Sequence, residues 1–142
     1  MIRKFKEEDT VKVMTIWTKG NFKAHPFIEK DYWLENFNRV KEEYLYKSET
    51  YVYVEDEEII GFISLLDNNY IGALFVKTDC ARQGIGKRLL NYVKEKYDKL
   101  TLNVYEKNID ATLFYVAMRF KNKKIQIDED TGEKEYIMEW EK

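Results

Sequence analysis

The stretch Thr78–Leu90 constrains the fold of this chain most, because it places two glycines between a strand-like run and a helix-like run. The apolar run at residues 70–76 predicts a strand. The residues that follow the glycines have the spacing of an amphipathic helix: Ile85, Leu89, Leu90, Val93 and Tyr97. Backbone N–H groups at the start of a helix have no partner within it, and glycine lets a phosphate approach them closely. The stretch therefore predicts a phosphate-binding turn.

Two common phosphate-binding motifs do not fit this turn. A P-loop, Gly-x-x-x-x-Gly-Lys-Ser/Thr, would need glycine where Ala81 stands and a hydroxyl where Arg88 stands. A dinucleotide-binding loop would need a third glycine at the position of Leu89, on a parallel sheet. We therefore reject an NTPase and a dinucleotide-dependent enzyme.

The remaining sequence alternates strand-like and helix-like segments, and we expect residues 1–142 to form a single domain. A helix that begins at residues 7–9 is expected to end at Gly20, and a second is expected at about 29–46. The full order is strand, helix, helix, three strands, helix, strand, helix and two strands. The short connections predict antiparallel pairing, apart from one parallel crossover within Tyr70–Val104. The predicted fold is a mixed α/β (α+β) domain.

Composition excludes several classes of protein. A formal net charge of −2 over 142 residues does not favour a nucleic-acid partner. One cysteine and one histidine allow no intramolecular disulfide and no Cys/His zinc site, so no metal is expected. We found no membrane-spanning run and no targeting segment, and we therefore expect a cytoplasmic protein with no membrane partner.

A second block, Leu100–Phe120, carries Asn108, Ala111 and Phe114-Tyr115 in order after a predicted strand. Together with Arg82-Gln83-Gly84-Ile85-Gly86, this block resembles the GNAT superfamily of N-acetyltransferases. The resemblance implies a mixed, mostly antiparallel sheet that is splayed between residues 70–76 and 100–104, with acetyl-CoA as co-substrate. Ala81 departs from the usual Gln or Arg of the loop. Arg119 replaces a usual glycine, so we expect the helix before it to end differently.

The resemblance also implies which residues bind acetyl-CoA. The backbone of Arg82–Lys87 would hold the pyrophosphate, and a strand N–H would stabilise the oxyanion of the tetrahedral intermediate. The complete set is Leu74, Phe75, Val76, Arg82, Gln83, Gly84, Ile85, Gly86, Lys87, Asn108, Ala111 and Tyr115. Tyr115 is the expected general acid for the leaving thiolate, because a phenol is protonated at neutral pH.

The helix that carries Tyr115 supports this interpretation. Its apolar stripe consists of Ile109, Leu113, Val116, Ala117 and Phe120. At 100° per residue, Tyr115 points away from that stripe and shares a face with Asn108 and Ala111. Such a face suits a ligand-lining surface. The alternative is a surface tyrosine that packs on a neighbour.

The general base is less clearly indicated, because residues 70–76 contain no acid. His25 is the candidate on grounds of its ordinary pKa. Aromatic residues surround it in the sequence: Trp17, Phe22, Phe27, Tyr32 and Trp33. They predict either an aromatic acceptor pocket or a hydrophobic core with an exposed His25, and a water chain could equally carry the proton.

The sequence leaves the acceptor open. We expect an acyltransferase that acetylates a primary amine of a small molecule by direct attack, because the chain is short and has no substrate-binding extension. The alternatives are a protein or peptide N-acetyltransferase and a non-catalytic acyl-CoA-binding module. Either a monomer or a homodimer is compatible with the sequence.

Overall fold

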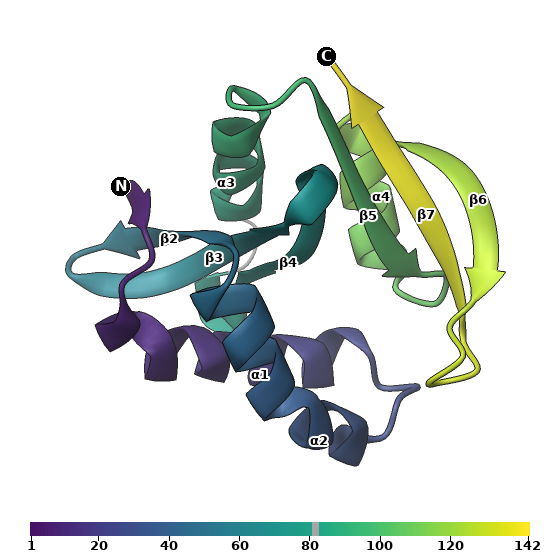
Figure 1. Cartoon of the computed structure of the whole chain (residues 1–142), viewed down its shortest axis with the longest axis horizontal. Coiled ribbons are helices and arrows are strands. Elements are labelled where there is room, and N and C mark those ends of the chain that lie inside the picture. The colour runs from purple at the N-terminus through teal and green to yellow at the C-terminus, as the bar shows by residue number, and fades with distance from the viewer. Residues whose placement is uncertain (81–82) are drawn as a thin grey trace.

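The computed structural model describes residues 1–80 and 83–142, apart from the side chain of Asn68. In this part of the chain, the strands form a seven-stranded sheet of order β1-β2-β3-β4-β5-β7-β6 (Figure 1). The strands are β1 (Ile2–Lys4), β2 (Glu49–Glu55), β3 (Glu58–Leu66), β4 (Tyr70–Val76), β5 (Lys99–Tyr105), β6 (Lys121–Ile127) and β7 (Lys134–Glu141). The α-helices are α1 (Thr10–Ala24), α2 (Lys30–Val40), α3 (Ile85–Lys94) and α4 (Ile109–Ala117). No helix in the described ranges is long and apolar enough to cross a membrane.

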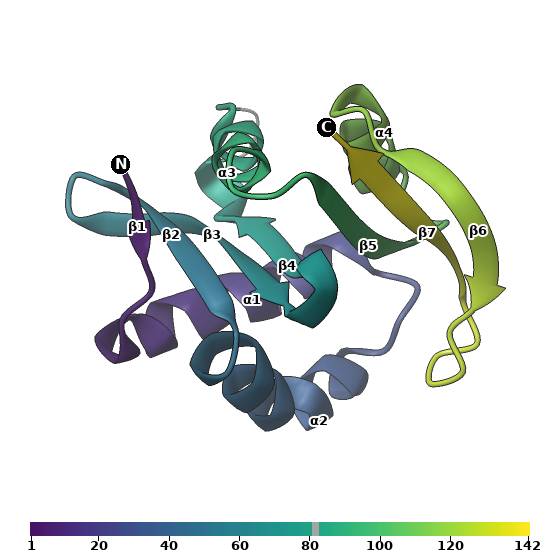
Figure 2. The same ribbon diagram turned by 45° about the horizontal axis from the view of Figure 1, so that its top comes forward.

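Helices cover both faces of the sheet, α1 and α2 on one and α3 and α4 on the other (Figure 2). Each face buries its own hydrophobic cluster. The first is centred on Met14 and Phe62 beneath α1 and α2, and the second on Leu90 and Leu102 beneath α3 and α4. Alternate residues of a strand point to opposite faces, so one strand serves both clusters. The predicted order of elements and the mixed α/β fold are confirmed.

The sheet separates at its centre. β4 and β5 run parallel, and in the described residues their pairing comprises the single position Tyr70↔Thr101. By contrast, β5 pairs with β7 along its whole length, from Lys99↔Glu141 to Tyr105↔Glu135. The strands β1–β4 therefore lie apart from β5–β7 beyond Tyr70 (Figure 1). This is the splay expected between residues 70–76 and 100–104.

The first two helices differ in detail from the expectation. The prediction that Gly20 ends the first helix is wrong, because α1 continues to Ala24. A Cβ at Gly20 would lie 2.5 Å from Cδ1 of Phe75, so glycine allows β4 to pack closely against the helix. The second helix begins as α2 and ends in a π-helical segment, η2 (Lys41–Tyr46).

The apolar stripe of α4 does not form the core, contrary to the expectation. Ile109, Leu113 and Val116 are 64%, 61% and 55% exposed, whereas Tyr115 is 9% exposed. The helix is apolar on several sides, and its hydrophobic pattern alone therefore does not tell which side faces the sheet. Arg119 follows the helix with φ 72°, the left-handed conformation that glycine usually supplies at this position.

Candidate acetyl-transfer site

The predicted phosphate-binding turn leads directly into α3. Gly84 precedes the helix in the left-handed conformation, φ 78° and ψ 12°, which is unfavourable for residues that carry a Cβ. The N–H of Arg88 donates to the carbonyl of Gly84 at 3.1 Å. The backbone N–H groups of residues 85–87 therefore have no acceptor within the helix, and they lie at the positive end of the helix dipole. Lys87 is exposed beside them. This arrangement suits an anionic group.

The same turn lies close to α4 and to the end of β4. A Cβ placed on Gly86 would be 3.6 Å from Cζ of Phe114 and 3.8 Å from Cγ2 of Val76. The predicted phosphate-binding turn is thus adjacent to the helix that carries Tyr115. A ligand on this turn could reach the gap between β4 and β5 along α4.

A cavity of about 350 Å³ opens where β4 and β5 separate. The two strands, α1, α2, α4 and the β6–β7 turn all contribute to its wall. Among the predicted residues, His25, Leu74, Phe75, Asn108, Ala111 and Tyr115 line it. A neighbouring hollow of about 530 Å³ shares Phe75 and Asn108 with the cavity and is also lined by Val76. The structure therefore brings together residues that are far apart in the sequence.

The predicted residues divide into two groups. The first group lies in the turn, where Gln83, Gly84 and Lys87 are exposed. The side chain of Ile85 is buried in the core, so only its backbone N–H could contact a ligand. The cavity residues form the second group. The predicted contact from Arg82, like the departure at Ala81, lies outside the described residues.

Asn108 connects α4 to His25. Its Oδ1 accepts a hydrogen bond from the N–H of Ala111 at 3.3 Å, which caps the helix. Its amide group then faces His25, with 3.2 Å between Nδ2 of Asn108 and Nε2 of His25. An amide nitrogen can only donate, so Nε2 of His25 is the acceptor and the ring proton lies on Nδ1.

His25 is buried among aromatic rings and is only 8% exposed. It stacks on Trp33 with ring centroids 5.1 Å apart, and it meets Tyr105 edge-on at 5.2 Å. Burial lowers the pKa of His25 from 6.5 to about 4. The imidazole is therefore neutral at physiological pH. Of the aromatic residues predicted around it, Phe27 and Trp33 have rings that pack against His25. The alternative of an exposed His25 is wrong.

Tyr115 lies on the buried side of α4, at the edge of the core and of the cavity. Its ring packs against Phe114 and Phe120, with centroids 5.2 Å and 5.5 Å away. Burial raises the pKa of Tyr115 above its ordinary value, with a smaller contribution from Tyr70. The hydroxyl thus keeps its proton at neutral pH, as a general acid requires.

Several cavity residues were not anticipated from the sequence. They are Tyr70, Tyr105, Asp128, Asp130 and Glu135. The hydroxyl of Tyr105 donates to Asp128 at 2.6 Å, and Glu135 is only 9% exposed. Alternation along the last strand places Glu135 on the face opposite Met138 and Trp140, but this pattern does not show that Glu135 is buried.

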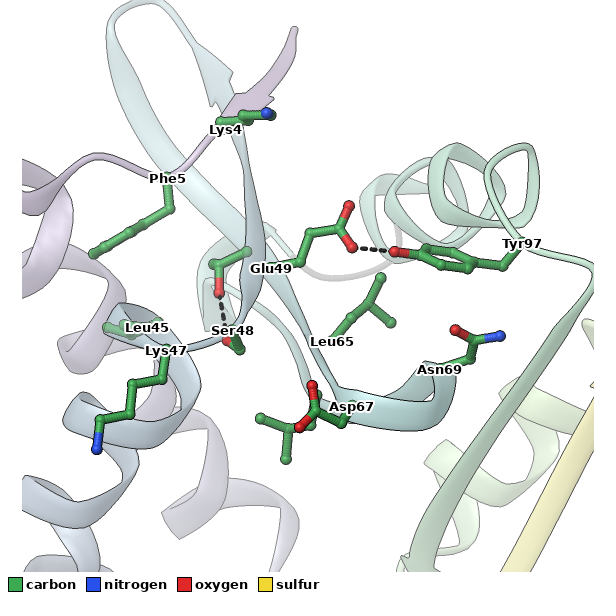
Figure 3. Close-up of a pocket in the computed structure, with 12 residues that line it drawn as sticks. Lys4, Phe5, Leu45, Lys47, Ser48, Glu49, Leu65, Asp67, Asn69 and Tyr97 are labelled. Atoms are coloured by element: carbon green, nitrogen blue, oxygen red, sulfur yellow. Dashed lines mark hydrogen bonds between the residues drawn. The ribbon is translucent and has the colours of Figure 1, made fainter.

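A separate hollow of about 520 Å³ lies near the start of β2 and the end of β3 (Figure 3). There the carboxylate of Glu49 accepts hydrogen bonds from the hydroxyls of Tyr97 and Tyr51. The bond from Tyr97 to Glu49 raises the pKa of Tyr97 to about 12. Among the described residues, this hollow shares no lining residue with the cavity. Likewise, the described side chains contain no group of three or more His, Cys, Asp or Glu placed to hold a metal ion.

Comparison with known proteins identifies the family. The family described as "Acetyltransferase (GNAT) domain" matches residues 19–141. The chain belongs to this GNAT family and is an acetyl-transfer enzyme.

Named relatives agree with this assignment. The chain is 32% identical to "Peptidyl-lysine N-acetyltransferase YiaC" of Escherichia coli (strain K12), over 99% of this chain and 96% of that protein. It is 34% identical to "Peptidyl-lysine N-acetyltransferase YjaB" of Salmonella typhimurium, over 84% of this chain and 82% of that protein.

Solved structures share the fold. The solution structure of apo-form YjaB from Escherichia coli superposes with a TM-score of 0.85 and 25% identity, over 99% of this chain and 96% of that one. A putative streptothricin acetyltransferase from Bacillus anthracis, solved in complex with acetyl coenzyme A, superposes with a TM-score of 0.61 and 23% identity. That match covers 67% of this chain and 62% of the other.

Proposed function

We propose that this enzyme transfers the acetyl group of acetyl-CoA to the side-chain amine of lysine in a peptide or protein. The observation that carries the proposal is the acidic lining of the cavity at the splay. Asp128, Asp130 and Glu135 line it together with one guanidinium, that of Arg39. A cationic amine is favoured by such a surface. The two relatives named as peptidyl-lysine N-acetyltransferases point to the same acceptor.

In this proposal, the pyrophosphate of acetyl-CoA binds the N–H groups at the start of α3, and the thioester lies between β4 and β5. The acceptor ammonium first loses a proton to a chain of water molecules, and the neutral amine then attacks the thioester carbonyl. A backbone N–H of β4 within residues 73–76 donates to the oxyanion that forms. As the carbon–sulfur bond breaks, Tyr115 donates its proton to the departing sulfur. The proposed reaction needs no metal ion.

We infer that His25 positions Asn108 and does not take the proton from the amine. Its Nε2 already accepts the amide of Asn108, and its pKa of about 4 makes it a weak base. If His25 were instead the general base, the His25→Ala variant would lose the fall in rate at low pH, which is the acidic limb of the pH–rate profile. Our assignment predicts that the limb persists, with a lower maximum rate.

The proposed acceptor is tested by following CoA release with acetyl-CoA and three kinds of amine. These are a lysine peptide with a blocked N-terminus, the same peptide with a free N-terminus and no lysine, and small amines such as polyamines and amino acids. Mass spectrometry then locates the acetyl group.

We expect acetylation of the blocked lysine peptide at its lysine. Turnover of small amines alone would contradict the lysine proposal and support the small-molecule acceptor favoured by the sequence. Tight CoA binding with no turnover of any amine would favour a binding module. A cytoplasmic location and the absence of nucleic-acid and membrane partners stay predictions, as does the choice between monomer and homodimer.

A further inference from the structure

Glu135 is a buried carboxylate for which the described residues provide no cation. It lies on β7, directly opposite Tyr105 of β5, and is 9% exposed. Nε2 of Gln126 donates to its Oε1 at 2.8 Å, and Nδ2 of Asn103 donates to the same oxygen at 3.3 Å. Both donors are neutral. Among the described residues, no hydrogen bond reaches Oε2 and no ion pair includes Glu135.

A buried charge is costly unless an opposite charge compensates it. The two amides hold Oε1 and thereby fix the orientation of the carboxylate. Since Glu135 also lines the cavity, a cationic ligand in the cavity could reach the remaining oxygen. The carboxylate of Glu135 is thus positioned to form an ion pair with a cation supplied by a ligand.

Two other charged groups of the cavity are already engaged, and a third, Asp130, is exposed. The guanidinium of Arg39 donates to Oδ1 of Asn36 at 3.0 Å and lies 3.5 Å from Glu43 on its own helical segment. Asp128 accepts the hydroxyl of Tyr105 and, at 3.0 Å, the N–H of Asp130. Glu135 is therefore the acidic residue of this wall that is both buried and lacking a charged or hydroxyl partner among the described residues.

Tyrosine residues line the same cavity. Tyr44, Tyr70 and Tyr105 line the cavity together with Glu135. Aromatic faces attract cations and also cover the methylene groups of an alkyl chain. The combination fits a primary ammonium on an unbranched alkyl stem better than a free anion or a bulky neutral group.

We propose that Glu135 binds the ammonium group of the acetyl acceptor through Oε2 and so selects primary alkylamines. This role of Glu135 depends on one part of the proposed function, namely that the acetyl acceptor binds in this cavity. Acetylation turns the ammonium into a neutral amide, so the same contact is lost in the product. Glu135 thereby discriminates the substrate from its acetylated product.

The test is a titration of CoA-saturated enzyme with n-butylammonium, a mimic of the lysine side chain, followed by NMR chemical shifts. We expect Glu135→Gln to weaken binding by about 10- to 100-fold, the effect of losing a hydrogen bond to a charged group. Glu135→Asp, which keeps the charge, should recover part of the affinity. The matched control is Glu139→Gln, on the same strand, because its carboxylate pairs with Lys99 at 3.3 Å and does not line the cavity.

A purely structural role of Glu135 would instead lower the melting temperature and the affinity for acetyl-CoA together. Unchanged n-butylammonium affinity in Glu135→Gln, within threefold of the wild type, overturns the proposal. So does the absence of saturable binding to the wild type. A different result would contradict only the proposal that lysine is the acceptor: n-butylammonium binds through Glu135, but lysine peptides are not acetylated.

Discussion

Nε2 of His25 and Nδ2 of Asn108 lie 3.2 Å apart, which joins the end of α1 to the residue that caps α4. The two residues both line the cavity and are far apart in the chain. Because Asn108 also caps α4, any change in the charge of His25 is transmitted to the start of the helix that carries Tyr115.

The buried His25 makes the stability of the enzyme sensitive to mild acid. Its folded pKa of about 4 lies below the ordinary value of 6.5, so its contribution to stability is complete above pH 6.5 and is lost as the pH falls toward 4. We expect a loss of about 2 kcal/mol between pH 7 and pH 5. Urea denaturation at the two pH values measures it.

The control for this prediction is His25→Gln, which keeps a hydrogen-bonding side chain but cannot titrate. Other acid-sensitive groups, such as Asp9 paired with Arg3, are common to both proteins. An equal loss of stability in His25→Gln would show that His25 does not cause the acid sensitivity.

Tyr115→Phe should lower kcat by about 100-fold or more, because general acid catalysis typically contributes that much. The dissociation constant of acetyl-CoA should stay within about twofold, since the ring and its packing are kept. Thiol release and equilibrium binding provide the two measurements. Tyr136→Phe is the matched control, a half-buried tyrosine of the same core that does not line the cavity. Unchanged turnover in Tyr115→Phe would rule out the acid role.

Gly84→Val should weaken acetyl-CoA binding by about tenfold or more, because a β-branched residue forces the turn out of the left-handed conformation. Gly132→Val is a suitable control. Gly132 has φ 75° and, like Gly84, has open space around its Cβ position, but it lies in the β6–β7 turn. Both variants should lose similar stability, measured by thermal unfolding. If they weaken acetyl-CoA binding equally, the turn before α3 does not hold the pyrophosphate.

Arg119→Gly should stabilise the fold by about 0.5–1 kcal/mol, since it relieves the left-handed strain at φ 72° and the gain exceeds the entropic cost of glycine. Chemical denaturation measures the difference. Arg119→Ala keeps the Cβ and should give no such gain. A comparable gain in both variants would mean that the arginine side chain, and not the backbone, is unfavourable.

Local patterns were sufficient for the order of the elements and for the turn before α3. Strand β4 was predicted with its observed bounds, because a nearly continuous apolar run between turns is typical of a central strand. Gly84 was recognisable as a turn residue because glycine, which has no Cβ, adopts the left-handed conformation without steric cost. Such features depend on neighbours in the chain, which the sequence displays directly.

Features that depend on tertiary packing were harder to predict. The continuation of α1 through Gly20 depends on Phe75, which is distant in the sequence. The buried side of α4 was misjudged because Ile109, Leu113 and Val116 resemble a core stripe. Glu135 was missed because its hydrogen-bond partners, Asn103 and Gln126, lie on two other strands. The GNAT motifs drew attention to Asn108 and Tyr115, but those motifs do not include Glu135.

The single paired position between β4 and β5 gives this protein two internal strand edges that face each other without a ladder of hydrogen bonds. An extended molecule placed between them has backbone groups available on both sides, as an added strand would. If acetyl-CoA binds there, as we propose, it connects two parts of the sheet that, among the described residues, are otherwise paired only at Tyr70↔Thr101. Amide hydrogen exchange in β4 and β5 should accordingly slow on addition of CoA, while exchange in the fully paired β5–β7 ladder changes less.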